Sequence, residues 1–222
     1  MRYFIQFGLS VIITCSIGYA KNLKICQSEE DKIQGCVEKY YYGNRNLWWA
    51  TPYKNGEKDG IAKSYHENGK LNGEVPYKKG KKDGIAKWHY SNGNLYKEVL
   101  HKDDEKEGIE KIYYENGNLM WKTPYKNGGR HGVEKWYYEN GNLRSEDLYK
   151  DDKREGIAKH YSENGNLIAM ITYQKDEAIS YECANGRKIL DINKLGIPIG
   201  YSGFMGHIDA WKVEINMYKT CG

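Results

Sequence analysis

The stretch that decides the fold is GIEKIYYENGNLMWKTPYKNGGRH, residues 108–131. At its centre lies the dipeptide Asn116-Gly117, between two segments in which the side chains alternate in character. Ile109, Lys111 and Tyr113 fall on one side of the first segment. Asn and Gly tolerate positive φ better than other residues, so Asn-Gly between alternating segments is typical of a two-residue β-hairpin turn. The stretch therefore predicts one hairpin, with positive φ at both turn residues.

The same line recurs with a period of 24 residues. Copies begin at Gly60, Gly84, Gly108, Gly132 and Gly156, the last being two residues shorter. A copy with one inserted residue precedes them at 35–59, and a half copy follows at 178–189. A fixed period in this range indicates a repeat architecture with irregular end copies. The recurring turn residues are Asn68, Gly69, Asn92, Gly93, Asn116, Gly117, Asn140, Gly141, Asn164 and Gly165.

Two strands and two turns account for a whole repeat and leave no residues for a helix. We therefore predict an all-β fold, an elongated antiparallel meander of β-hairpin repeats in a single-layer sheet of about 12 to 14 strands. Its ends need caps, because bare sheet edges invite aggregation. The expected organisation is a signal peptide (1–20), an N-terminal cap (21–34), the repeats (35–189) and a C-terminal cap (190–222). The C-terminal cap contains one strand with Trp211, Val213, Ile215 and Met217 on one face.

Residues 1–20 have the layout of a secretory signal peptide. Arg2 precedes an apolar run, and Gly18, Tyr19 and Ala20 form a small-x-small cleavage site. The run is shorter than the roughly 20 residues that a bilayer requires. We expect cleavage after Ala20 and a secreted or periplasmic protein with no transmembrane helix in the mature chain. An uncleaved anchor and lipidation at Cys15 are the alternatives.

Export changes the meaning of the cysteines. The mature chain has four, an even number in a compartment where disulfides persist. Of the three possible pairings, Cys26 with Cys36 and Cys183 with Cys221 closes each end of the chain locally. We predict these two disulfides as structural staples.

The repeat as a whole resembles a known family. The pattern G-[IV]-x-K-x-Y-x-x-N-G-x-L, followed by an aromatic residue and K-N-G-x-x-x-G, resembles the MORN repeat variant over residues 35 to about 189. In bacteria it is similar to the YwqK-type antitoxins. The resemblance implies an elongated sheet used for protein or lipid contacts, with no catalytic residues to carry over.

Enzyme chemistry finds little support in the sequence. The six His residues show no metal-ligand spacing, and no nucleophile elbow or phosphate-binding loop occurs. The recurring carboxylates Glu67, Glu115, Glu139 and Glu163 look equivalent, whereas acid–base catalysis needs two different environments. A net charge of +4 with interleaved acids and bases does not indicate a nucleic-acid partner. We expect no enzyme, no cofactor and no metal site.

Two columns of residues are the candidate binding site. Each Lys lies two residues before a Tyr in a strand, or before His89 in the case of Lys87, so both point to the same face. Such a face suits an unknown protein partner, an anionic lipid or a glycan. Alternatively, the Lys stems only cover the aromatic rows, with Glu38, Glu110 and Glu134 neutralising part of the charge. The columns consist of Lys63, Lys87, Lys111, Lys135, Lys159, Tyr65, Tyr113, Tyr137 and Tyr161.

The resulting hypothesis is a non-enzymatic, exported repeat scaffold for protein–protein or envelope-surface interaction. The alternatives are an antitoxin or immunity-type protein that neutralises a toxin, and a peripheral protein that binds lipid headgroups through the Lys and Tyr columns.

Overall fold

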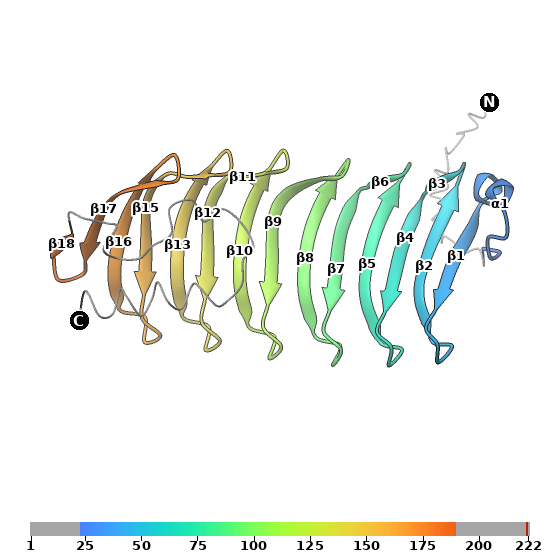
Figure 1. Ribbon diagram of the computed structural model, residues 1–222, viewed down its shortest axis with the longest axis horizontal. Helices are drawn as coiled ribbons and strands as arrows, with labels where there is room; N and C mark the ends of the chain where they lie inside the picture. Colours follow the sequence, from blue (N-terminus) through green and yellow to red (C-terminus); the bar gives the residue numbers. More distant parts are fainter. Residues whose placement is uncertain (1–22, 190–220, 222) are drawn as a thin grey trace, which may run out of the picture.

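The computed structural model describes residues 23–189 and Cys221, and they form a long, gently curved sheet one layer thick (Figure 1). A short helix, α1 (Glu29–Gln34), precedes the sheet. The strands are β1 (Cys36–Tyr41), β2 (Leu47–Lys54), β3 (Glu57–Lys58), β4 (Gly60–Tyr65), β5 (Leu71–Lys78), β6 (Lys81–Lys82), β7 (Gly84–His89), β8 (Leu95–Lys102), β9 (Glu105–Tyr113), β10 (Leu119–Lys126), β11 (Gly129–Arg130), β12 (Gly132–Tyr137), β13 (Leu143–Lys150), β14 (Lys153–Arg154), β15 (Gly156–Tyr161), β16 (Leu167–Gln174), β17 (Glu177–Cys183) and β18 (Lys188–Ile189).

Every strand pair in this part of the chain is antiparallel between neighbours in the sequence. β1 pairs with β2, β2 with β4, β4 with β5, and the series continues to β17 and β18. The two-residue segments β3, β6, β11 and β14 pair with the strand before them and lead directly into the strand that follows. The predicted all-β meander of hairpins is confirmed.

The Asn-Gly turn differs from the predicted type. Gly117 has φ +91°, but neither Asn116 nor the equivalent Asn of the other repeats has a positive φ. The Gly117 amide donates to the Tyr114 carbonyl at 2.9 Å, and the Tyr114 amide donates to the Asn118 carbonyl at 2.8 Å. The loop thus has three residues, Glu-Asn-Gly, which is the hairpin form that places a left-handed Gly after a type I turn. The expectation of positive φ at both turn residues was wrong for this turn.

Asn116 has a different task. Its Oδ1 accepts the Asn118 amide at 2.8 Å, and Asn118 Nδ2 donates to the Glu139 carbonyl of the next repeat at 2.8 Å. The same pair of bonds recurs at Asn92 and Asn94 and at Asn140 and Asn142. The first Asn shapes the turn and the second Asn ties it to the next repeat.

The two-residue turn with two positive φ values lies at the opposite edge of the sheet. Asn55 and Gly56 have φ 54° and 79°, and Asp103 and Asp104 have φ 50° and 75°. Where Asp takes the second position, its carboxylate reaches back to the preceding repeat, as in the Lys82 amide to Asp104 Oδ1 bond of 2.8 Å. An Asp-Asp turn therefore replaces the conformational freedom of Gly with an extra hydrogen bond between repeats.

The two faces of the sheet differ in burial. We call the face that carries Ala62, Val75, Ala86 and Val99 the packed face, because these side chains are buried under large neighbours such as Trp88. Cross-strand partners share a face, so the partners Ile61–Pro76 and Lys63–Glu74 lie on the other side, which we call the open face.

Both ends of the described chain carry a disulfide. Cys26–Cys36 joins the segment before α1 to β1, where Ile25 also forms a parallel bridge with Val37. Cys183–Cys221 joins β17 to the C-terminus, and Cys221 packs against the buried cluster that contains Tyr181. The predicted cysteine pairing is confirmed. The expected signal peptide and the expected strand at Trp211–Met217 lie outside the described residues.

Candidate binding surface

The structure brings the predicted Lys and Tyr columns together on the open face. Each Lys of the column has a Glu on an adjoining strand. Ion pairs form at 2.9 Å between Lys63 and Glu74 and at 2.8 Å between Lys111 and Glu98. Glu146 contacts both Lys135 and Lys159 at 3.2 Å. Burial raises the pKa of the Glu146 carboxyl, but the two lysines outweigh it and the net pKa is lowered.

The glutamates that neutralise the column are not the ones expected from the sequence. Glu110 and Glu134 follow the open-face residues Ile109 and Val133 directly, so they point to the packed face, as does Glu38. The partners are instead Glu74, Glu98 and Glu146 on the adjoining strands. The error arose because nearness in sequence was taken for nearness in space, although a strand alternates its faces.

The Tyr column belongs partly to these ion pairs. The Tyr113 hydroxyl donates to Glu98 at 3.1 Å and the Tyr161 hydroxyl donates to Glu146 at 3.3 Å. A second tyrosine column, one residue later, was missed. The Tyr114 hydroxyl donates to the Tyr137 carbonyl of the next repeat at 2.8 Å. The equivalent hydroxyls of Tyr42, Tyr90 and Tyr138 each donate to the corresponding carbonyl of their own next repeat.

A row of exposed aliphatic residues runs along the open face, and the sequence reasoning did not single it out. The residue after each closing Gly is exposed, from 42% at Val133 to 56% at Ile85. Its cross-strand partner is Pro or Leu in the first four repeats, as in Ile85–Leu100 and Ile109–Pro124, and Thr172 in the last. The available signal was the alternation that already placed Ile109 beside Lys111 and Tyr113. We call this row the aliphatic stripe: Pro52, Ile61, Pro76, Ile85, Leu100, Ile109, Pro124, Val133, Leu148 and Ile157.

Lysines border the aliphatic stripe on both sides. On one side lies the predicted Lys column with its interleaved glutamates. On the other side lies a row of exposed lysines at the strand ends, which we call the edge lysines: Lys54, Lys78, Lys102, Lys126 and Lys150. Within residues 23–189 and Cys221, no ion pair within 4.0 Å involves an edge lysine.

The positive charge of the open face is densest at its centre. In the third repeat, Lys122 stands where the neighbouring repeats have Glu98 and Glu146. Lys122 is the cross-strand partner of both Lys111 and Lys135, so three lysines lie side by side. A ligand on this face would meet three neighbouring lysine side chains there.

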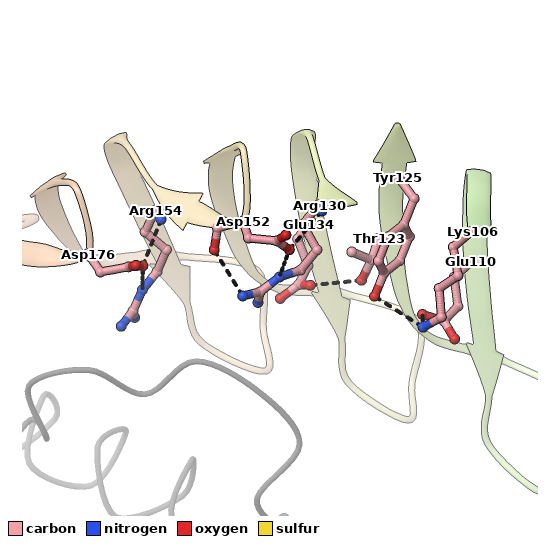
Figure 2. Close-up of polar contacts among 9 residues, drawn as sticks. All are labelled: Lys106, Glu110, Thr123, Tyr125, Arg130, Glu134, Asp152, Arg154 and Asp176. Atoms are coloured by element: carbon pink, nitrogen blue, oxygen red, sulfur yellow. Dashed lines mark hydrogen bonds and ion pairs between the residues drawn. The ribbon is translucent and has the colours of Figure 1, made fainter. Parts of the chain in front are cut away.

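The packed face carries a ladder of basic groups over tyrosine rings. Arg130 lies 4.0 Å from the ring centre of Tyr149, and Arg154 lies 4.2 Å from that of Tyr173. Lys58, Lys106 and Lys32 repeat the contact on Tyr77, Tyr125 and Tyr53. Figure 2 shows that the arginines also contact Asp152 and Asp176 of the next turn. The ladder stacks one repeat on the next.

Carboxylates lie buried under this ladder. Glu134 accepts from Thr123 Oγ1 at 2.7 Å (Figure 2) and from Trp136 Nε1 at 2.9 Å. Asp147 is its cross-strand partner, and burial raises the pKa of the Asp147 carboxyl to about 6. Burial also raises the pKa of Glu134. Glu110 differs, because Lys97 at 2.6 Å and Lys106 at 2.9 Å outweigh the effect of burial and lower its pKa.

Two of the buried carboxylates, Glu110 and Glu134, are held by neighbouring side chains. Across the described chain, no group of three or more His, Cys, Asp or Glu side chains is placed to hold a metal ion. Nor does any described helix have the length and apolar character needed to span a membrane.

Comparison with family models matches the MORN repeat variant five times, at residues 58–79, 82–103, 106–127, 130–151 and 154–175. The matches start 24 residues apart, in agreement with the period of the sequence and the sheet. Comparison with curated proteins finds no match.

Proposed function

Since the chain belongs to the MORN repeat variant family over residues 58–175, we propose that it is an exported, non-catalytic scaffold that binds a protein partner through the open face. MORN repeats are scaffold motifs associated with binding and are a non-catalytic repeat type. The observation that carries the proposal is the aliphatic stripe, which stays exposed across five repeats. Exposed apolar residues on a monomer are ordinarily scattered singly, whereas an apolar row with a polar rim is a feature of interaction sites.

Export is supported by the cysteines. The two disulfides are of the kind that persists in oxidising compartments, and their positions staple both ends of the sheet. Fractionation of the source cells with intact-mass measurement tests this part. We expect a chain that begins at Lys21, with a mass that rises by about four hydrogens on reduction. A full-length reduced protein in the cytoplasm would contradict export.

The binding face is tested by photo-crosslinking in the source cells. A crosslinking residue at Lys122 in β10 samples the open face. One at Lys82 in β6, the cross-strand partner of Tyr77, samples the packed face. We expect protein adducts from the first position and few from the second. Adducts only from the packed face would contradict the proposal.

Two alternative functions make different demands. A lipid-binding protein would use the lysines of the open face on an anionic membrane, and its binding would fall sharply as salt screens the charges. An antitoxin would suppress the effect of a toxic protein, so removal of this chain from cells would be harmful unless that toxin were removed too. Neither alternative requires a row of exposed aliphatic side chains.

A further inference from the structure

The aliphatic stripe is a narrow track rather than a broad patch. It crosses the ten long strands between β2 and β15, leaving out the two-residue segments, so it is about 43 Å long at 4.8 Å per strand. Along a strand, an edge lysine lies two residues to one side of the stripe, as Lys78 does beside Pro76. The inner row, with Glu74, lies two residues to the other side. The two charged rows are therefore about 13 Å apart.

These dimensions fit an α-helix that lies along the track. A helix with its side chains is about 10–12 Å wide, which matches the gap between the charged rows. Successive repeats are about 9.6 Å apart, close to the rise of about 10.5 Å over seven helical residues. A helix with one apolar stripe thus presents apolar side chains at every repeat, and a track of this length takes roughly 29 residues.

The charges specify the flanks of the helix. The edge lysines have no ion-pair partner within the described chain, and three lysines meet at Lys111, Lys122 and Lys135 on the inner side. Acidic residues on both flanks of a helix would pair with these rows. A second copy of this chain would instead bring lysine rows against lysine rows.

From the dimensions and the charge we infer that the open face binds an acidic amphipathic helix of a partner protein, laid across the repeats along the aliphatic stripe. The inference rests on the proposed scaffold function and names its partner class. A membrane fits less well, because Glu74, Glu98 and Glu146 interrupt the inner row and would repel anionic headgroups. Side chains of a helix can pair with lysines and avoid those glutamates individually.

The test uses the oxidised mature protein and synthetic helical peptides of about 29 residues. One peptide has Leu at heptad spacing with Glu on both flanks, the second has Lys in place of Glu, and the third is a scrambled isomer of the first. Vesicles with and without anionic lipid are measured in parallel. We expect saturable one-to-one binding of the acidic peptide and at least tenfold weaker binding of the other two.

Variants locate the site. Ile85→Thr, Ile109→Thr and Val133→Thr together remove aliphatic surface but keep β-branched, strand-compatible side chains. We expect this triple variant to weaken the acidic peptide roughly tenfold, since the contact is largely apolar. Ile33→Thr in α1, a similarly exposed aliphatic residue outside the stripe, is the control and should bind normally. The melting temperature of each variant shows that it has folded.

Three results would overturn the inference: no binding of the acidic peptide, binding that the triple variant leaves intact, or binding of anionic vesicles alone. These failures are separable from a failure of the proposed function. If Lys122 crosslinks to a protein in cells while the peptide does not bind, the scaffold stands and the helical partner falls. If neither result is obtained, both fall.

Discussion

Single glycines decide the backbone of each repeat, and the two kinds do so for different reasons. Gly141 in the Glu-Asn-Gly turn has φ +91°, and a Cβ there would meet nothing within 4 Å. Gly132, which closes the other turn, has φ +118°, and a Cβ there would lie 2.9 Å from Pro124 Cγ. The first position needs Gly only for its backbone angle, whereas the second also needs the space.

We therefore expect Gly132→Ala to destabilise the protein more than Gly141→Ala. A left-handed Ala costs about 1–2 kcal/mol, and the contact with Pro124 adds about 1–3 kcal/mol of overpacking. Chemical denaturation of the two variants measures the difference in unfolding free energy. Equal losses would show that Pro124 moves away without cost and would contradict the packing argument.

A second residue-scale effect concerns pH. The folded-state pKa of Asp147 is raised to about 6 from an ordinary 3.8, so the folded protein holds this proton more tightly than the unfolded chain. The stabilisation is fully present below the unfolded pKa and is lost as the pH rises through the folded pKa. The pKa of Glu134 is raised too, while Arg130 opposes both shifts and Arg154 opposes that of Asp147. The carboxyls with lowered pKa, including Glu98 and Glu146, act only in more acidic solution.

We expect the raised pKa of Asp147 to cost the wild-type protein up to about 3 kcal/mol of stability between pH 4 and pH 7, since a shift of about two pKa units corresponds to that energy. Asp147→Asn should flatten the profile in part, and Asp147→Asn with Glu134→Gln should flatten it further. Denaturation midpoints across this range measure the effect. Asp103→Asn at an exposed turn is the control, and a flat wild-type profile would disprove the buried-charge account.

At the scale of the elements, strands are held in line by bonds that run from one repeat to the next. The Tyr114 hydroxyl and the Asn118 amide group both donate to carbonyls in the following repeat, and Asp104 accepts from the preceding one. Each hairpin alone is only marginally stable, because an isolated strand pair has no second layer to cover it. The bonds between repeats therefore matter as much as those within one.

Loss of one such bond should be measurable. Tyr114→Phe removes the hydroxyl that bonds to the Tyr137 carbonyl and leaves that half-buried carbonyl without this donor, at a cost of about 1 kcal/mol or more. Tyr65→Phe is the matched control, because no hydrogen bond of the Tyr65 hydroxyl occurs among the described residues. Thermal or chemical denaturation compares the two. A control as unstable as the Tyr114 variant would point to ring packing rather than to the hydrogen bond.

The repeat pattern predicts most of this level and misses part of it. The period, the hairpins and the strand directions follow from recurrence and alternation in one chain, and the cysteine pairing follows from local closure of each chain end. The type of the Asn-Gly turn was wrong because Asn-Gly fits two hairpin geometries, and the hydrogen bond from Gly117 to Tyr114 identifies the three-residue form. The partners of the Lys column were missed because they lie on the adjoining strand. The exposure of Ile109 was missed because an Ile in a strand is ordinarily buried, although the alternation had placed it on the face of Lys111 and Tyr113.

At the scale of the whole molecule, stability is expected to pass from repeat to repeat. In a linear array each unit contacts only its neighbours, so a disturbance at one end spreads inward over a limited distance. The C-terminal end depends on the disulfide between Cys183 and Cys221, beside the buried cluster of Tyr181 and Ile171.

Cys183→Ala with Cys221→Ala should therefore loosen the chain locally. We expect hydrogen-exchange protection to fall in β15, β16 and β17 while β4, β5 and β7 keep theirs, because the principal contacts among the described strands join neighbours along the sheet. Exchange followed by mass spectrometry of peptic fragments gives the profile. A uniform loss along the sheet would mean that the array unfolds as a single cooperative unit.

The Glu-Asn-Gly turns also affect the chemical damage that proteins accumulate at Asn residues over time. Asn followed by Gly is the dipeptide most prone to succinimide formation, in which the Gly amide nitrogen attacks the Asn side-chain carbonyl and isoaspartate results. In the folded turn, the Gly117 amide is held by the Tyr114 carbonyl and the Asn116 side chain is held by the Asn118 amide. The hydrogen bonds that build the hairpin thus also hold in place the two groups that would react to form the succinimide. Isoaspartate in these turns would record how long each repeat has spent unfolded.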